Sequence, residues 1–156
     1  PELVRRMVRD GHAVGNHSWS HPEFWKSSKR TIRKELAKTN GLLVKLGAAP
    51  TLMRPPFGEW DPRVAKTSKS LGLAGILWDV DTLDWKSRNT KKVTKLVLRE
   101  VRPGSIILTH DTLTTTRKAY PAIIKGLRAK GYTLVTVPEL LGARLHAGGR
   151  YANAKS

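Results

Sequence analysis

Apolar side chains recur three or four positions apart along much of this chain, which is the spacing of an amphipathic helix. In residues 28–46 this periodicity places isoleucine and leucine side chains on one face, and Ser27 or Ser28 can cap the helix. Asp61 followed by Pro62 is a typical helix start. The pattern predicts helices over residues 3–8, 28–46, 62–71, 90–101, 116–130 and 138–141.

Short apolar runs between these helices predict β-strands. We place the strands at residues 12–16, 51–54, 73–80, 105–109 and 132–137. Strands that alternate with helices pair in parallel, because each connection crosses back over the sheet. The sequence therefore predicts an α/β fold with parallel strands.

The 156 residues, of which 39% are apolar, suffice for one moderate core and one domain. Residues 142–156 are basic and rich in glycine and alanine, so we expect a flexible tail there. The longest apolar run, residues 71–78, is far shorter than the roughly 18–20 residues that span a bilayer. We expect no membrane span, and no targeting segment is visible in a chain that begins with Pro1.

The charge balance narrows the choice of partners. Twenty-nine basic and 12 acidic residues give a net charge of +17, which attracts polyanions such as nucleic acid, acidic lipid surfaces or an anionic cell-wall polymer. No nucleic-acid-binding motif accompanies the basic residues, so we expect no specific nucleic acid partner. The chain has no cysteine, which rules out disulfides and leaves histidine as its main ligand for a transition metal.

Two histidines four positions apart, His17 and His21, are the first candidate for chemistry. This spacing can place both rings on one side of a turn or short helix, where neutral imidazoles suit zinc and similar metals. The alternative is that one ring caps a loop and the other is merely exposed. The pair alone does not decide between these two interpretations.

The segment Arg54-Pro55-Pro56-Phe57-Gly58 follows a predicted strand. A residue before proline is held extended, so Arg54 is rigidly placed. The stiff loop can direct a backbone N–H, such as that of Phe57, at a ligand oxygen. The alternative is an ordinary rigid turn with a surface arginine.

Two further polar groups follow predicted strands. Asp84 and Trp85 end a segment that has three carboxylates between two tryptophans. An aspartate at this place could belong to a catalytic site or could simply cap a helix. His110 ends the apolar run that contains Leu108, and a histidine there can donate a proton near neutral pH or be a structural core residue. Catalytic side chains of parallel β/α folds lie at such strand ends, so the pattern favours an enzyme.

Taken in order, these segments resemble the polysaccharide deacetylase (NodB-homology) family, carbohydrate esterase family 4. The resemblance runs from about Pro1 to Leu141 and includes residues 10–17, which lead into the histidine pair. It implies an irregular (β/α) barrel, and a hydrolase that acts on carbon–nitrogen bonds other than peptide bonds. The expected reaction is metal-dependent removal of acetyl groups from N-acetylated sugars.

The resemblance also implies roles for the residues that match the family's motifs. His17 and His21 would bind a divalent metal, zinc in the first place and cobalt as a second choice. Arg54 would orient the catalytic base, and the Phe57 N–H would help to hold the oxyanion.

In the second half of the chain, Asp84 would support the arginine and histidine network, and Trp85 would form a wall of the substrate groove. Leu108 would form a wall of the acetyl pocket, and His110 would be the general acid. The expected substrate is peptidoglycan or a chitin-like N-acetylglucosamine polymer. The expected location is outside the cell or in the cell wall.

One family motif has no match in this chain. The family's Thr-Phe-Asp-Asp-Gly-Pro motif supplies the catalytic base and a third metal ligand, whereas none of the six aspartates here is adjacent to another. We therefore expect residues 1–141 to be a partial, N-terminally truncated deacetylase domain with about five of seven strands and impaired activity. The alternative is a catalytically dead remnant that binds carbohydrate.

Overall fold

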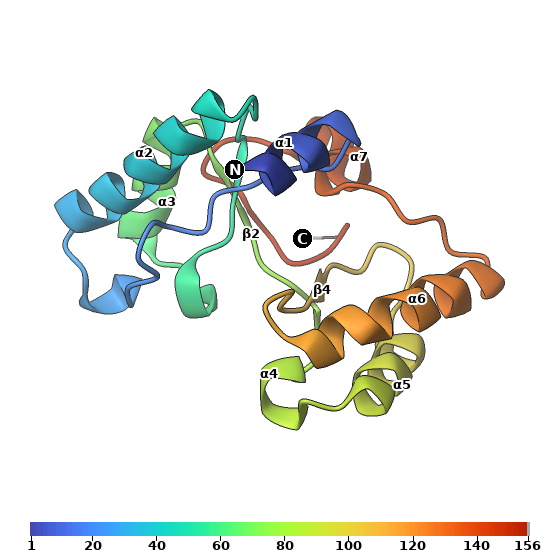
Figure 1. Ribbon diagram of the computed structural model, residues 1–156. Helices are drawn as coiled ribbons and strands as arrows, with labels where there is room; N and C mark the ends of the chain where they lie inside the picture. Colours follow the sequence, from blue (N-terminus) through green and yellow to red (C-terminus); the bar gives the residue numbers. More distant parts are fainter. Residues whose placement is uncertain (156) are drawn as a thin grey trace. The chain divides into compact units, whose positions relative to one another are not determined.

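The computed structural model describes residues 1–155 and divides the chain into two compact units (Figure 1). The first unit contains Pro1–Leu77 and Thr136–Tyr151, and the second contains Trp78–Val135 with the residues from Ala152 on. Within residues 1–155, no helix is both long enough and apolar enough to cross a membrane.

Helices of the first unit begin where the sequence predicts caps. The Ser28 hydroxyl accepts a hydrogen bond from the Thr31 N–H, and the Asp61 carboxylate accepts from the N–H groups of Arg63 and Val64. The helices of this unit are α1 (Glu2–Arg9), η1 (Phe24–Lys26), α2 (Lys29–Lys45), η2 (Pro56–Gly58), α3 (Pro62–Ser70), α7 (Val137–Leu141) and η3 (Gly142–Arg144).

The sheet of the first unit is parallel, with the strand order β1-β2-β5. Its strands are β1 (Leu52–Met53), β2 (Ala74–Ile76) and β5 (Arg150–Tyr151). Gly75 lies at the centre of β2, where a Cβ would be only 2.1 Å from the Trp60 ring, so only glycine fits. The predicted strand 12–16 is reduced to a single parallel bridge between Asn16 and Met53.

An apolar cluster holds this unit together. Helices α2 and α3 lie side by side and pack over β1 and β2 (Figure 1). Each fully buried aliphatic or aromatic side chain contributes about 1.5–3 kcal/mol relative to exposure. The buried members of the cluster are Phe24, Ile32, Leu36, Met53, Val64 and Leu73.

The second unit is built on two helices that pack against each other, α5 (Thr90–Glu100) and α6 (Thr114–Ala129). The short helix α4 (Asp84–Ser87) precedes them, and β3 (Val80–Asp81) pairs in parallel with β4 (Ile107–Leu108). Asn89 caps α5 by accepting a hydrogen bond from the Lys92 N–H. The core of this unit consists of Val80, Val93, Val97, Val101, Ala119, Ile123 and Leu127.

Both sheets are parallel, as predicted, but two of the predicted strands differ from the structure. The predicted strand 73–80 is divided into β2 and β3, which belong to different sheets. Residues 132–137 form no strand in the described part of the chain: Leu134 and Val135 are about half exposed, and no neighbouring strand pairs with them. Within residues 142–155, where the sequence predicts a flexible tail, Arg150–Tyr151 forms β5. The Tyr151 carbonyl accepts a hydrogen bond from the Leu77 N–H at 2.7 Å, which joins β5 to the end of β2.

Candidate metal and catalytic site

The His17–His21 pair lies on a tight turn rather than on a helix. Ser18 and His21 both adopt left-handed backbone conformations, with φ of 64° and 57°. Such conformations cost about 1–3 kcal/mol each and persist only where other contacts enforce them. The His21 N–H donates to the Ser18 hydroxyl at 3.0 Å, and the two imidazole ring centroids are 4.9 Å apart.

The tautomer of His17 follows from its hydrogen bond. Its Nδ1 lies 2.6 Å from the carbonyl oxygen of Arg54. A carbonyl oxygen can only accept, so Nδ1 carries a proton and, in the neutral ring, Nε2 carries the lone pair. Metal-binding histidines are commonly oriented by this kind of bond to a backbone carbonyl. The His17 ring therefore fits a metal ligand that binds through Nε2.

Helix α2 holds the turn through two side chains that the sequence reasoning missed. Asn16 is buried; its amide donates to the Leu36 carbonyl at 2.8 Å, and its oxygen accepts from the Ser18 N–H at 2.8 Å. The Glu35 carboxylate accepts from the N–H groups of Trp19 and Ser20 at 2.9 and 2.7 Å. The available signal was that Glu35 is the only acidic residue in an otherwise basic helix.

The charge on Glu35 is stabilised by these contacts. Partial burial raises the pKa of the Glu35 carboxyl, but the hydrogen bonds from Ser20 and Trp19 and the nearby Lys38 ammonium outweigh burial. The pKa therefore lies below its usual value. An ionised carboxylate is the stronger acceptor for the two N–H groups of the turn.

Arg54 and Phe57 lie beside the histidine turn. The Arg54 guanidinium donates to the carbonyls of Ile76 and Leu77, both at 3.1 Å, and so is fastened to the end of β2. Phe57 is left-handed, with φ of 57°, and its ring contacts the His21 ring at 4.8 Å between centroids. Within the described residues, the Phe57 N–H donates no hydrogen bond to another protein group, which fits a donor kept for a ligand oxygen.

In the second unit, Asp84 and His110 form a tightly bound pair. The Asp84 side chain is fully buried, and its Oδ1 lies 2.7 Å from His110 Nδ1. Its Oδ2 accepts from the His110 N–H at 2.7 Å and from the Thr116 hydroxyl at 2.8 Å. Sequence reasoning did not select Thr116, because nothing in the residues around it signals this contact.

These contacts affect the protonation of the Asp84 carboxyl and the His110 ring. Burial raises the pKa of the Asp84 carboxyl, but the hydrogen bonds from His110 and Thr116 outweigh burial and leave that pKa below its ordinary value. An ionised carboxylate only accepts, so His110 Nδ1 carries a proton. The Nε2 atom is then the nitrogen of His110 that can exchange a proton with a ligand.

The other predicted site residues of this unit differ in exposure. Trp85 follows Asp84 in α4 and is 54% exposed, as a groove wall would be. Leu108 is buried in β4, and its carbonyl accepts from the Thr82 hydroxyl at 2.8 Å. The role of Leu108 as an acetyl-pocket wall stays a prediction, as does the shared network of Asp84 with Arg54.

The structure thus assembles the predicted residues in two groups. His17, His21, Arg54 and Phe57 belong to the first unit, and Asp84, Trp85, Leu108 and His110 belong to the second. Among residues 1–155, no cluster of three or more histidine, aspartate or glutamate side chains could hold a metal. The His17 ring is oriented as a metal ligand would be, but the described residues supply no third side-chain ligand for a metal.

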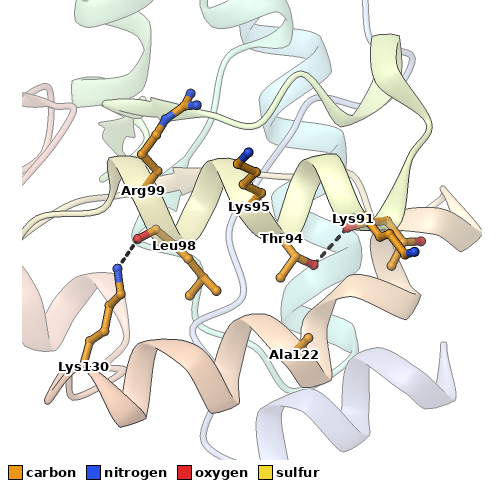
Figure 2. A pocket seen from close by; sticks show the side chains of 8 residues that line it. Lys91, Thr94, Lys95, Leu98, Arg99, Ala122 and Lys130 are labelled. Carbon is orange, nitrogen blue, oxygen red and sulfur yellow. Dashed lines mark hydrogen bonds between the residues drawn. The ribbon is translucent and has the colours of Figure 1, made fainter.

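One cavity of the second unit contains none of these residues. It lies between α5 and α6, has a volume of about 730 Å³, and has Leu98 and Ala122 at its floor (Figure 2). Figure 2 shows Lys130 reaching from the end of α6 to the Leu98 carbonyl, a hydrogen bond of 2.5 Å. Its lining is mainly apolar and cationic and has no carboxylate or imidazole.

Comparison with known proteins places the chain in a family. The sequence profile described as polysaccharide deacetylase matches residues 1–76. The solved structure of T48 deacetylase with substrate is 35% identical, with a TM-score of 0.91 over 97% of this chain and 75% of that one. The chain belongs to the polysaccharide deacetylase family. Its fold is the α/β barrel type of that family, with the short strands described above.

Curated relatives agree with this assignment. The peptidoglycan-N-acetylglucosamine deacetylase PgdA of Listeria monocytogenes is 41% identical over 97% of this chain and 32% of its own length. The chitooligosaccharide deacetylase of Bradyrhizobium sp. is 33% identical over 90% of this chain and 71% of its own length. The chain therefore spans about a third of the length of the first relative and most of the second.

Two more solved structures bear on activity and cofactor. A family 4 acetyl xylan esterase from Clostridium thermocellum, in complex with a cobalt ion, is 35% identical over 88% of this chain and 68% of that one, with a TM-score of 0.82. A family 4 pseudoenzyme from Bacillus anthracis is 28% identical over 98% of this chain and 53% of that one, with a TM-score of 0.83. The family thus includes both metal-binding and inactive members.

Proposed function

We propose that the protein is a metal-dependent deacetylase that hydrolyses the acetamide groups of an N-acetylated glycan. The observation that carries this proposal is the bond from His17 Nδ1 to the Arg54 carbonyl, which presents Nε2 as a ligand beside His21. The family membership and the Asp84–His110 pair, which suits proton transfer, support it.

A divalent metal held by His17 and His21 would supply a Lewis acid and lower the pKa of a bound water. As water adds to the acetyl carbonyl, the catalytic base that the family's Asp-Asp motif supplies would take the proton of the water, and the Phe57 N–H would donate to the developing oxyanion. His110 would deliver a proton from Nε2 to the departing amine, and the Asp84 carboxylate would stabilise the imidazolium before that transfer. The carbon–nitrogen bond breaks, and the products are acetate and a free amino sugar.

The identity of the metal is part of the proposal. Two imidazoles favour zinc, which tolerates few ligands and tetrahedral geometry. The cobalt ion in the related acetyl xylan esterase makes cobalt the second choice. Arg54, whose guanidinium is fastened to the end of β2, would orient the catalytic base, as the family motif implies.

The proposed substrate is peptidoglycan, with a chitin-like N-acetylglucosamine polymer as the second choice. The similarity to a peptidoglycan deacetylase supports the first, and the similarity to a chitooligosaccharide deacetylase supports the second. Such a substrate implies a location outside the cell or in the cell wall. Trp85 and Leu108 are the proposed walls of the groove and of the acetyl pocket.

Attraction to an anionic cell-wall polymer is a further part of the proposal. The cavity in Figure 2 is bordered by Lys91, Lys95, Arg99 and Lys130. No carboxylate of the described residues forms an ion pair with Lys91 or Lys95. These cations are suited to contact phosphate or carboxylate groups of a polymer.

A second candidate function is carbohydrate binding without catalysis. Two observations favour this function for the chain by itself. Residues 1–155 contain no cluster of three possible metal ligands, and a related family 4 protein is a pseudoenzyme. We expect the 156-residue chain to release acetate from an N-acetylglucosamine hexamer slowly at most, because two imidazoles bind a metal weakly without a carboxylate.

The experiment compares acetate release by the chain with added zinc, with a chelator and without addition. Zinc-stimulated release that His110→Asn abolishes would establish the deacetylase in this chain and refute our expectation of impairment. Glycan binding that the chelator leaves unchanged, with no acetate released, supports the binding function. A chain that neither binds zinc nor binds the hexamer overturns both proposals.

A further inference from the structure

Two tryptophans next to the histidine turn are exposed to solvent. Trp19 is 47% exposed and Trp25 is 59% exposed. A single exposed apolar residue needs no explanation, because much of any protein surface is apolar. Here two tryptophans lie within seven positions of each other, and both leave a large part of the side chain exposed. A buried aromatic side chain of this kind removes about 150–250 Å² from solvent.

The backbone that carries these rings is nevertheless firmly held. The Trp25 N–H donates to the Glu59 carboxylate at 3.0 Å, and the Trp25 carbonyl accepts from the Arg63 guanidinium at 3.2 Å. Its neighbour Phe24 is fully buried in the core. The Trp19 N–H donates to Glu35 at 2.9 Å. The exposed rings are therefore displayed from an ordered scaffold rather than from a loose loop.

A lysine ammonium lies over the ring of each tryptophan. Lys38 Nζ lies 3.8 Å from the Trp19 ring centroid, and Lys26 Nζ lies 4.6 Å from the Trp25 ring. A cation over an aromatic face is attracted by about 0.5–1 kcal/mol at exposed sites. The cation covers one face of each indole, and the exposed fractions show that much of each ring remains open to a ligand.

Trp19 belongs to the histidine turn, and Trp25 is held by the segment that contains Phe57. Trp19 lies on the turn between His17 and His21. Glu59, which holds the Trp25 N–H, follows Phe57 by two residues, and the Phe57 ring contacts His21. All of these residues belong to the first unit, so their arrangement does not depend on the second unit.

We propose that Trp19 and Trp25 form a glycan-binding subsite beside the histidine turn, at which pyranose rings of the strand beyond the reacting sugar stack on the indoles. A pyranose ring presents an apolar face of C–H groups between its polar edges, which matches an indole face that is fixed and half exposed. The identity of the ligand as an N-acetylated glycan rests on the proposed function. Binding at this subsite needs no metal.

The test measures binding of an N-acetylglucosamine hexamer by titration calorimetry in the presence of a chelator. Trp19→Ala and Trp25→Ala should each weaken binding about fivefold to tenfold, as truncation of an aromatic anchor does. Trp25→Phe should restore most of the affinity because it keeps a ring. Val44→Ala is the matched control, since Val44 is 60% exposed on α2 in the same unit and should not affect binding.

Thermal unfolding of each variant shows whether the fold is intact. Equal affinity of the wild type and both alanine variants would overturn the subsite, whether or not the chain releases acetate. Weakened binding by both variants in a chain that releases no acetate would support the subsite and count against the deacetylase. An equal loss of affinity in Val44→Ala would also overturn the subsite, because it would show that the effect is not local.

Discussion

The histidine turn and the Asp84–His110 pair are both built around an imidazole, but their surroundings differ. His17 is exposed and is oriented by a backbone carbonyl. The His110 ring is oriented by a fully buried carboxylate, which also accepts from a backbone N–H and a threonine hydroxyl. The Asp84–His110 pair has its hydrogen-bond partners within its own unit. The histidine turn, in contrast, has two potential metal ligands and no third in residues 1–155.

This difference separates stability from ligand binding. Removing a member of a buried, fully hydrogen-bonded network leaves other polar groups unsatisfied, so the fold is destabilised. Removing an exposed imidazole costs the fold little and affects only what the imidazole would bind. Mutations of the Asp84–His110 pair should therefore lower stability, whereas mutations of the histidine turn should lower metal affinity and change stability little.

The largest expected effect is on the fold. Asp84→Ala leaves the His110 N–H, the His110 ring and the Thr116 hydroxyl without their acceptor, and should lower the free energy of unfolding by about 3–5 kcal/mol. Urea denaturation measures the change. Asp111→Ala, an exposed aspartate beside His110, is the matched control and should change stability by less than about 0.5 kcal/mol. A loss below about 1 kcal/mol for Asp84→Ala would contradict the role of this network.

Metal binding should show the opposite pattern. His17→Ala should abolish most of the zinc affinity while changing the stability of the metal-free chain little. Zinc at a hundred times its dissociation constant should raise the stability of the wild type by about 2.7 kcal/mol, and the variant should lose this gain. His146→Ala, which removes a histidine outside the site, serves as the control. An unchanged zinc-induced shift in His17→Ala would show that zinc binds elsewhere.

A smaller effect is expected where helix α2 supports the turn. Glu35→Gln keeps the shape of the side chain but weakens its hydrogen bonds to the N–H groups of Trp19 and Ser20. Zinc affinity should fall about tenfold, the lower end of the range for groups that orient ligands. Glu2→Gln, at the start of α1, is the control. The measurement is zinc titration, and equal affinities would mean that the turn keeps its shape without the carboxylate.

The smallest effect is a dependence of stability on pH. The pKa of Asp84 is lower in the folded protein than its ordinary value of 3.8, so the ionised form stabilises the fold above that pH. This contribution is lost as pH falls through the folded pKa. The stability difference between the wild type and Asp84→Asn should shrink as pH falls below about 4. A difference that grows on acidification would refute the assignment.

Much of the local structure could be predicted because its causes lie close together in sequence. The caps Ser28 and Asp61 bond to residues two or three positions away, and apolar periodicity identified the main helices. Strand positions were harder to predict, because a strand also needs a partner. Residues 132–137 have the composition of a strand but pair with no strand in the described chain. Arg150–Tyr151, in contrast, pairs in parallel with β2.

The sequence by itself determined which residues could carry the chemistry: His17, His21, Arg54, Phe57, Asp84 and His110 stand in motifs that are recognisable from residue type and spacing. Only the tertiary structure decided how these side chains are held. The partners that set the tautomer of His17, the shape of its turn and the charge of Asp84 lie 15 to 37 positions away in sequence. Such contacts depend on the packing of whole helices and strands, which no local pattern contains.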